Sequence, residues 1–185
     1  KARLRTFGSN PLWLYANYRF LLSVTEDKAS TWTTTIMMKD ISIIRPELIA
    51  SIHALCEGED DSIAIMATVS AELFHAVDGY DWVGFYRVVA SNLLKIGPYQ
   101  GGHGCLTIPF DRGVCGAAAR QQAIQLVEDV DHFEGHIACS SLTKSELVIP
   151  CFNRDGHLLG VLDIDSYQPN FFKWQEANQL DQVLR

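Results

Sequence analysis

A predicted β-hairpin near the C-terminus limits the possible folds of this chain more than any other feature. Two apolar runs, Glu146–Phe152 and Leu158–Asp165, are joined by the turn Asn153-Arg154-Asp155-Gly156. The Asp-Gly pair supplies the positive φ angles that a tight hairpin turn needs. Strands joined by such a turn pair in the antiparallel direction. The sheet that holds these two strands is therefore predicted to be antiparallel at this point.

Two amphipathic helices are predicted before the strands. The first begins at Pro46, a residue favoured in the first turn of a helix, and ends near Gly58. The second begins near Asp60-Asp61-Ser62, whose side chains suit a helix cap, and ends at Asp78-Gly79. The apolar stripe of the second helix is predicted to consist of Ile63, Met66, Val69, Leu73, Phe74 and Val77.

A closing helix is predicted from about Lys173. Its apolar face is predicted to carry Trp174, Ala177, Leu180 or Asp181, and Leu184. The other predicted elements are strands at 82–89, 93–99, 105–110 and 123–127, a short helix at 113–122, and a long loop at 128–144. Helices at the ends and strands in the middle predict an α+β fold, in which helices cover an antiparallel sheet.

Length and charge exclude several classes of protein. A chain of 185 residues, 48% of them hydrophobic, suits one domain with a sizeable core. The net charge of −7 argues against nucleic-acid partners, whose phosphates attract a basic surface, and against anionic membrane surfaces. No apolar run approaches the roughly 20 residues that cross a bilayer, so no membrane association is expected.

The cysteine content favours a reducing compartment. The chain has five cysteines, and an odd number at this length is not typical of a small secreted disulfide scaffold. A cytoplasmic location is therefore expected. Cys56 and Cys151 lie on apolar stripes and are expected to be packed thiols.

A metal centre is not predicted. Zinc sites usually pair their ligands as in CxxC, and the chain has no such pair. His136-x-x-Cys139 alone is weak evidence for zinc. His136 is interpreted as a loop hydrogen-bonding residue, with the alternative that its charge lowers the pKa of Cys139. Neither a metal nor another cofactor is expected.

Residues 1–36 differ from the rest of the chain in being rich in aromatic and β-forming residues. Arg19 interrupts their apolar run, which argues against a signal peptide. Met37-Met38 resembles an original start, so residues 1–36 are predicted to be an N-terminal extension and residues 37–185 the folded domain. We expect the extension to pair along a sheet edge or to bury against a partner chain.

Three acidic residues, Glu146, Asp163 and Asp165, occupy predicted strands. Asp163 and Asp165 are two positions apart and therefore point to the same face of the sheet. One reading is a solvated face. The other is a carboxylate cluster whose mutual repulsion raises at least one pKa. Trp82 and Tyr86 also share a strand face, either as ordinary core or as the wall of a pocket.

Six motifs occur in order along the chain: WVGFY (82–86), GPYQG (97–101), IPFDRGVCG (108–116), GHIAC (135–139), KSELVIP (144–150) and GVLDIDS (160–166). Together they resemble the free methionine-(R)-sulfoxide reductases, which are single GAF-domain enzymes. The resemblance implies a GAF fold, with a central antiparallel sheet flanked by helices, that reduces free L-methionine-(R)-sulfoxide. It also implies thioredoxin as the reductant, a cytoplasmic location and a homodimer.

The resemblance assigns roles to three thiols. Cys139 would be the attacking thiol and Cys105 the resolving thiol, with Cys115 as a secondary partner or a packed thiol. The chemistry is consistent, because sulfoxide reduction needs a thiolate to attack sulfur and a second thiol to convert the sulfenic acid to a disulfide. Cys139 on a loop and Cys105 after the flexible GGHG run suit these roles.

The acidic and aromatic residues complete the predicted site. Glu146 and Asp165 are expected to supply the proton for the sulfoxide oxygen, and Asp163 to receive the substrate's ammonium group. Trp82 and Tyr86 are expected to form the wall that accepts the thioether methyl group.

Two departures from the family pattern leave alternatives open. Ser140 stands where the family usually has aspartate, and Cys56 and Cys151 lie outside its cysteine set. One alternative is a GAF module that senses or binds a small ligand without chemistry, although such modules usually adjoin an output domain. Another is a reductase scaffold disabled by Ser140 or by the N-terminal extension.

Overall fold

The structure, a computed structural model, describes residues 44–184, so the predicted extension at 1–36 lies outside the described residues. The strands are β1 (Trp82–Ala90), β2 (Leu93–Gly101), β3 (Thr107–Pro109), β4 (Gln125–Val127), β5 (Ser145–Phe152) and β6 (Leu158–Ser166). The helices are α1 (Pro46–Leu55), α2 (Ser62–Ala76), α3 (Gly113–Gln121) and α4 (Trp174–Val183), with a 3-10 turn, η1, at Val130–His132.

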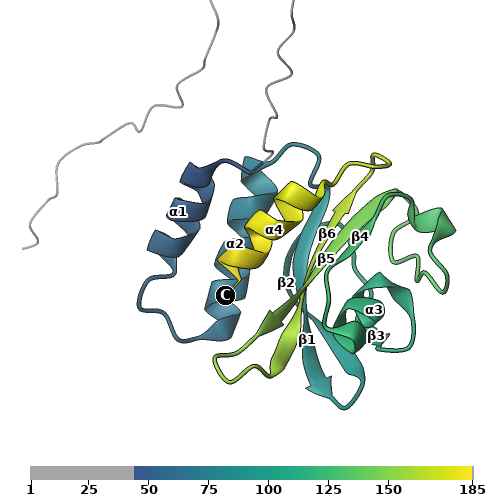
Figure 1. Cartoon of the computed structure of the whole chain (residues 1–185), viewed down its shortest axis with the longest axis horizontal. Helices are drawn as coiled ribbons and strands as arrows, with labels where there is room; N and C mark the ends of the chain where they lie inside the picture. The colour runs from purple at the N-terminus through teal and green to yellow at the C-terminus, as the bar shows by residue number, and fades with distance from the viewer. Residues whose placement is uncertain (1–43, 185) are drawn as a thin grey trace, which may run out of the picture. The chain divides into compact units, whose positions relative to one another are not determined.

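The strands form one six-stranded sheet in the order β3-β2-β1-β6-β5-β4, with antiparallel pairing between all neighbours. Figure 1 shows α1, α2 and α4 against one face of this sheet and α3 against the other. The predicted α+β fold, an antiparallel sheet with flanking helices, is confirmed. The β5–β6 hairpin turns at Gly156, which has a φ of 80°.

The predicted start of α2 is confirmed by its cap. The Asp61 side chain accepts a hydrogen bond of 2.8 Å from the N–H of Ile63. Met66, Val69 and Leu73 are buried against the sheet as predicted. The prediction is wrong for Ile63, whose side chain is 40% exposed. The buried face of α2 begins one turn later, at Met66.

The predicted face of α4 is wrong at its first residue. Trp174 is 58% exposed, whereas Ala177 and Leu180 are buried as predicted. The buried face instead includes Glu176, which accepts hydrogen bonds from the Tyr80 hydroxyl and from the Lys173 N–H. These two hydrogen bonds offset the cost of burying the Glu176 carboxyl group, which the helical pattern of the sequence predicts to lie in solvent.

Alternate residues of one strand lie in two different cores. On β1, Val83 and Phe85 pack with α1, α2 and α4, whereas Trp82 and Tyr86 pack on the side of α3. The prediction that Trp82 and Tyr86 share a face is therefore confirmed. Among the residues that the structure describes, no helix is long and apolar enough to cross a membrane.

Candidate active site

Cys105 and Cys139 are joined by a disulfide, although they are 34 positions apart, and their Cα atoms are 5.1 Å from each other. The predicted strand at 105–110 is shorter than expected, so Cys105 lies in the turn before β3. Cys139 lies in the loop between η1 and β5, and this loop is tied to α3 by a 2.9 Å hydrogen bond from Gly113 N–H to Gly135 O. The fold, and not the local chain, brings the two thiols together.

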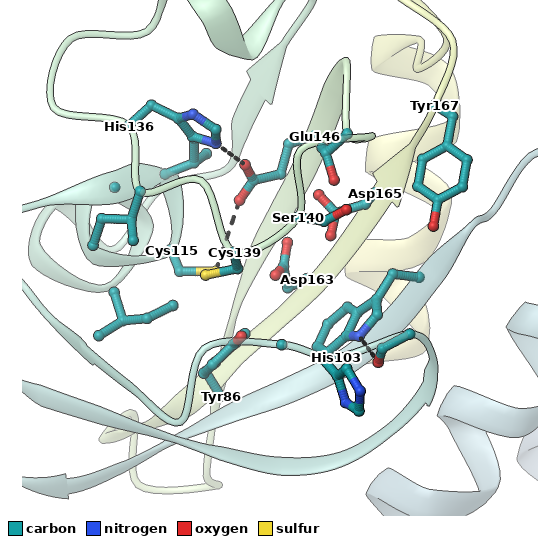
Figure 2. Close-up of a pocket in the computed structure, with 18 residues that line it drawn as sticks. Tyr86, His103, Cys115, His136, Cys139, Ser140, Glu146, Asp163, Asp165 and Tyr167 are labelled. Carbon is teal, nitrogen blue, oxygen red and sulfur yellow. Dashed lines mark hydrogen bonds and ion pairs between the residues drawn. The ribbon is translucent and has the colours of Figure 1, made fainter.

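A pocket lies beside this disulfide, between the sheet and the first turn of α3 (Figure 2). Cys139 lines it, and Cys105 is absent from its lining. The other residues selected from the sequence also line it: Trp82, Tyr86, Cys115, Glu146, Asp163 and Asp165. The structure therefore gathers the predicted thiol, acidic and aromatic residues around one cavity.

The strand register places the acidic residues side by side. Asp165 on β6 is paired with Glu146 on β5 and with Trp82 on β1, so these three form one row across the sheet. Asp163 lies in the next row, opposite Gly84 and Val148. Glu146 is only 6% exposed and Asp163 only 5%. The reading of a solvated sheet face is therefore wrong for these two residues, while Asp165 beside them is partly exposed.

Burial makes these carboxyl groups hold their protons. Burial, followed by the charge of Asp163, raises the pKa of both Glu146 and Asp165 well above the usual range. Burial also raises the pKa of Asp163, to about 7. An ionised carboxylate is costly to desolvate, and neighbouring carboxylates add repulsion. Near neutral pH the cluster therefore contains at least one carboxylic acid that can donate a proton.

One oxygen of the cluster has an unsatisfied hydrogen-bonding capacity. Within residues 44–184, Asp163 Oδ1 is buried and has no hydrogen-bond partner. Buried polar atoms normally have a partner, because an unmade bond costs free energy. An acceptor left open at the pocket wall suits a ligand that brings its own N–H donors.

Cys115, in the first turn of α3, is a free and buried thiol. Its Sγ donates a hydrogen bond of 3.9 Å to Glu146 Oε1. Burial, followed by the charges of Asp163 and Glu146, raises the pKa of the Cys115 thiol well above its usual value. Because the thiolate is the nucleophilic form, Cys115 is poorly suited to attack.

A donor set for a cation is present in the same cluster. One ligand atom each from Cys115, Glu146 and Asp163 lies within 4.8 Å of the others. Zinc accepts such sulfur and oxygen donors, but only in their deprotonated forms. A cation bound there would have to displace the protons that the raised pKa values of these groups favour.

His136 faces the carboxylate cluster. Its Nε2 lies 3.8 Å from Glu146 Oε2, as Figure 2 shows. Burial lowers the pKa of His136, and burial raises that of Glu146, so the two groups meet mainly in their neutral forms. The alternative that a charged His136 lowers the pKa of Cys139 is therefore disfavoured.

An aromatic stack forms another part of the wall. The ring of Trp82 stacks with Tyr86 at 5.8 Å and with Tyr99 at 5.3 Å between ring centroids. A Cβ atom at Gly84 would come within 2.6 Å of the Trp82 ring, so glycine leaves the space that the stack fills. The Trp82 indole N–H donates a 3.2 Å hydrogen bond to Gly102 O and so fixes the adjoining loop.

The pocket also includes residues that sequence reasoning did not select. Thr143 is buried, and its hydrogen bond partly offsets the upward shift of the Asp165 pKa. Tyr167 follows β6 and is held by a 2.7 Å bond from its N–H to Asp81 Oδ2. Ser140 Oγ accepts a 3.2 Å bond from Leu142 N–H. Serine and aspartate side chains can both accept such a bond from the backbone two residues on, so the turn at Ser140 does not require aspartate.

The amino-acid sequence of this chain is similar to those of known proteins. Residues 61–183 match the family model of the GAF domain. A protein of Saccharomyces cerevisiae named free methionine-R-sulfoxide reductase is 41% identical over 148 residues, which are 77% of this chain and 82% of that protein. A protein of the same name from Escherichia coli is 41% identical over 132 residues, which are 71% of this chain and 79% of that protein.

A solved structure is similar to the same part of the chain. It is the X-ray structure of free methionine-R-sulfoxide reductase from Neisseria meningitidis in complex with its substrate. The two chains are 42% identical, with a TM-score of 0.71, and the match covers 75% of this chain and 82% of that one. The similarity therefore extends from sequence to three-dimensional structure.

Proposed function

The chain belongs to the GAF domain family and, within it, to the free methionine-R-sulfoxide reductases, and we propose that it reduces free L-methionine-(R)-sulfoxide to methionine in the pocket beside Cys139. The observation that carries the proposal is the position of the Cys105–Cys139 disulfide at a pocket that the carboxyl groups of Glu146, Asp163 and Asp165 also line. A sulfur nucleophile and a proton donor are the two groups that sulfoxide reduction needs.

The proposed reaction proceeds in two steps. The Cys139 thiolate bonds to the sulfoxide sulfur while the oxygen is protonated. The oxygen then transfers to Cys139 Sγ: its bond to the methionine sulfur and the transient sulfur–sulfur bond both break, methionine leaves, and Cys139 is left as a sulfenic acid. The Cys105 thiol then attacks the sulfenic sulfur, the disulfide forms and the oxygen leaves as water. The sulfoxide gains two electrons, and the two thiols lose them.

We assign the protonation step to Glu146 and Asp165. Both lie in the pocket wall, and burial raises the pKa of each well above the usual range, so both groups retain protons at neutral pH. A carboxylic acid that donates to the sulfoxide oxygen in the transition state typically contributes about 10²–10⁴-fold to the rate. His136 and Thr143 support the proposed roles by orienting Glu146 and Asp165 respectively.

We assign recognition of the substrate to the remaining wall residues. The open acceptor Oδ1 of Asp163 suits the ammonium group of a free amino acid. The first turn of α3 also lines the pocket, and the N–H groups at a helix N-terminus suit the carboxylate. Trp82 and Tyr86 offer an apolar wall for the methyl group. Recognition of both ends of the amino acid favours free over protein-bound methionine sulfoxide.

We propose that Cys115 is not the attacking thiol. Its raised pKa and its hydrogen bond to Glu146 support a role as a packed thiol beside the acid. If it resolves the sulfenic acid at all, it does so more slowly than Cys105, which is already bonded to Cys139.

The wider setting is also proposed. We infer thioredoxin as the reductant, because a protein disulfide formed in each turnover needs a dithiol to reopen it. A cytoplasmic location follows from that requirement and from the cysteine content. A homodimer, and a domain spanning 37–185 with 1–36 as an extension, stay predictions.

The test is an assay of the full chain with racemic methionine sulfoxide and dithiothreitol. We expect methionine to appear and the remaining sulfoxide to be enriched in the S form, as measured by chiral chromatography. Consumption of both forms at equal rates would contradict the proposed stereochemistry. Binding of the sulfoxide without formation of methionine would favour the alternative of a ligand-sensing GAF module.

A further inference from the structure

Two uncharged segments surround the disulfide of this acidic protein. Residues 101–109 (GGHGCLTIP) and 135–143 (GHIACSSLT) contain no Asp, Glu, Lys or Arg, although such residues make up 20% of the chain. Within them, Leu106 is 71% exposed, the most exposed large apolar side chain in the described part of the chain, and Leu142 is 57% exposed. We call these two leucines, which flank Cys105 and Cys139, the apolar rim.

The backbone holds the apolar rim in place. Leu106 O accepts a 3.1 Å hydrogen bond from Ile96 N–H on β2. Leu142 N–H donates to Ser140 Oγ at 3.2 Å. The exposure of these side chains therefore does not come from a loose backbone. A partner that covers an anchored side chain loses less ordering entropy than one that must first fix a loop.

The two cysteines of the disulfide differ in their relation to the pocket. Cys139 lines the pocket and Cys105 does not, so in the proposed reaction the substrate meets Cys139 from the pocket. A reductant that approaches on the Cys105 side does not have to enter the pocket. Attack at Cys105 also releases Cys139 as the thiolate that the next turnover uses.

We propose that the apolar rim is the docking surface for the dithiol protein that reduces the disulfide, and that this partner attacks Cys105. The inference rests on the proposed function for its biological purpose. The partner's thiolate bonds to Cys105 Sγ, the Cys105–Cys139 bond breaks, and Cys139 leaves as a thiolate. The partner's second thiol then attacks the mixed disulfide. The partner becomes a disulfide, Cys105 leaves as a thiolate that is protonated, and two electrons have reached the enzyme.

The chemistry of the apolar rim selects a protein over a small thiol. The centre of a protein interface is depleted in charged residues and enriched in apolar area, and the two segments around the disulfide have that composition. A small charged thiol covers neither leucine and gains nothing from them. The partner is therefore a protein with an apolar surface around its reactive cysteine, of which thioredoxin is the probe.

The test measures reduction of the disulfide alone, without any sulfoxide. The oxidised full-length chain is mixed with reduced thioredoxin or with dithiothreitol, and the rate of disulfide loss is followed by thiol titration. The variants are Leu106→Ser, Leu142→Ser and both together. The control is Leu55→Ser, which is equally exposed at 57% but lies on α1, on the other face of the sheet (Figure 1).

We expect the double variant to be reduced by thioredoxin about tenfold more slowly than the wild type, the loss expected for removing an apolar anchor from an interface. Its rate with dithiothreitol and both rates of Leu55→Ser should be unchanged. An unchanged rate with thioredoxin, or an equal loss with both reductants, overturns the proposal. A changed molecular mass of the double variant in light scattering also overturns it, because the surface then joins copies of this chain.

A trapping experiment tests the site of attack. Thioredoxin that lacks its second reactive cysteine stops at the mixed disulfide, and peptide mass spectrometry identifies the bonded cysteine. Cys105 is expected, and Cys139 would overturn the proposed direction. Because neither experiment uses methionine sulfoxide, failure of the docking proposal is distinguishable from failure of the proposed function.

Discussion

The two faces of the sheet receive side chains from the same strands but differ in chemistry. Strand β6 sends Leu162 and Ile164, both at 0% exposure, into the core beneath α1, α2 and α4. It sends Asp163 and Asp165 to the α3 side, where burial raises the pKa of both. Burial on the first face stabilises the fold, whereas burial of the carboxyl groups on the second disfavours their ionised forms.

The α3 face therefore carries a cost in stability, because it takes carboxyl groups out of water. Substitutions on the two faces should therefore separate activity from stability.

The largest expected effect is on the α3 face and removes the proposed nucleophile. In Cys139→Ser, reduction of methionine sulfoxide should fall to the rate without enzyme, because a serine hydroxyl cannot replace a thiolate at neutral pH. Methionine formation with dithiothreitol measures this. Cys56→Ser, a change of the same kind on the other face, is the control and should retain activity. Activity in Cys139→Ser together with its loss in Cys115→Ser would identify a different nucleophile.

The next effect removes the proposed acid. Glu146→Gln, and separately Asp165→Asn, should lower kcat by about 10²–10⁴-fold, because an amide cannot donate the same proton. Their free energies of unfolding, from urea titration, should not fall, since each amide replaces a group that is costly to ionise. Glu134→Gln, at an exposed loop position, is the matched control. Normal turnover in both variants would limit the cluster to a structural role.

The opposite pattern is expected on the helical face. Leu162→Ala should reduce the free energy of unfolding by about 2–5 kcal/mol, because it opens a cavity in a fully buried core. Turnover per folded molecule should stay near that of the wild type, which active-site titration of the thiols measures. A large loss of kcat at full folding would show that the two faces are coupled.

The smallest effect concerns pH. A carboxyl group with a raised pKa in the folded state binds more protons there than in the unfolded chain, so stability falls as the pH rises from its unfolded pKa toward its folded one. For Asp163 this window extends from about 4 in the unfolded chain to about 7 in the folded one. Asp163→Asn should make the fall in stability across this window shallower.

The measurement is urea unfolding of the wild type and of Asp163→Asn between pH 4 and pH 8. The difference between the two proteins reports on Asp163 together with Glu146 and Asp165, whose pKa values its charge raises. Asp111→Asn, at an exposed position, is the control and should follow the wild type. Parallel curves for the wild type and Asp163→Asn would show that Asp163 titrates normally and that the α3 face carries no such cost.

Sequence alone was sufficient for the faces of the strands. The two-residue period places Asp163 with Asp165 and Trp82 with Tyr86, and both predictions are confirmed. The turn at Asp155-Gly156 and the cap at Asp61 are local signals and were also readable. The pairing of Cys105 with Cys139 needed the family resemblance, because nothing local connects two residues that are 34 positions apart.

Sequence was insufficient where a residue depends on a distant partner. Glu176 is buried because Tyr80, 96 positions earlier, donates a hydrogen bond to it, and no helical pattern contains that information. The orientation of α4 about its axis that buries Glu176 also leaves Trp174 exposed. Thr143 and Tyr167 reach the pocket from the loops at the ends of β5 and β6, where no periodicity applies.

The stacked rings of Trp82, Tyr86 and Tyr99 have an optical consequence. Aromatic rings held at 5.3 and 5.8 Å in a fixed asymmetric stack couple their electronic transitions, which generates a near-ultraviolet circular dichroism band. Because Trp82 lines the pocket and is buried, this band is sensitive to changes in the structure of the pocket wall. Ligand entry beside the stack and loss of tertiary packing would both alter it. The protein thus carries a chromophore of its own at the place where its chemistry is proposed to occur.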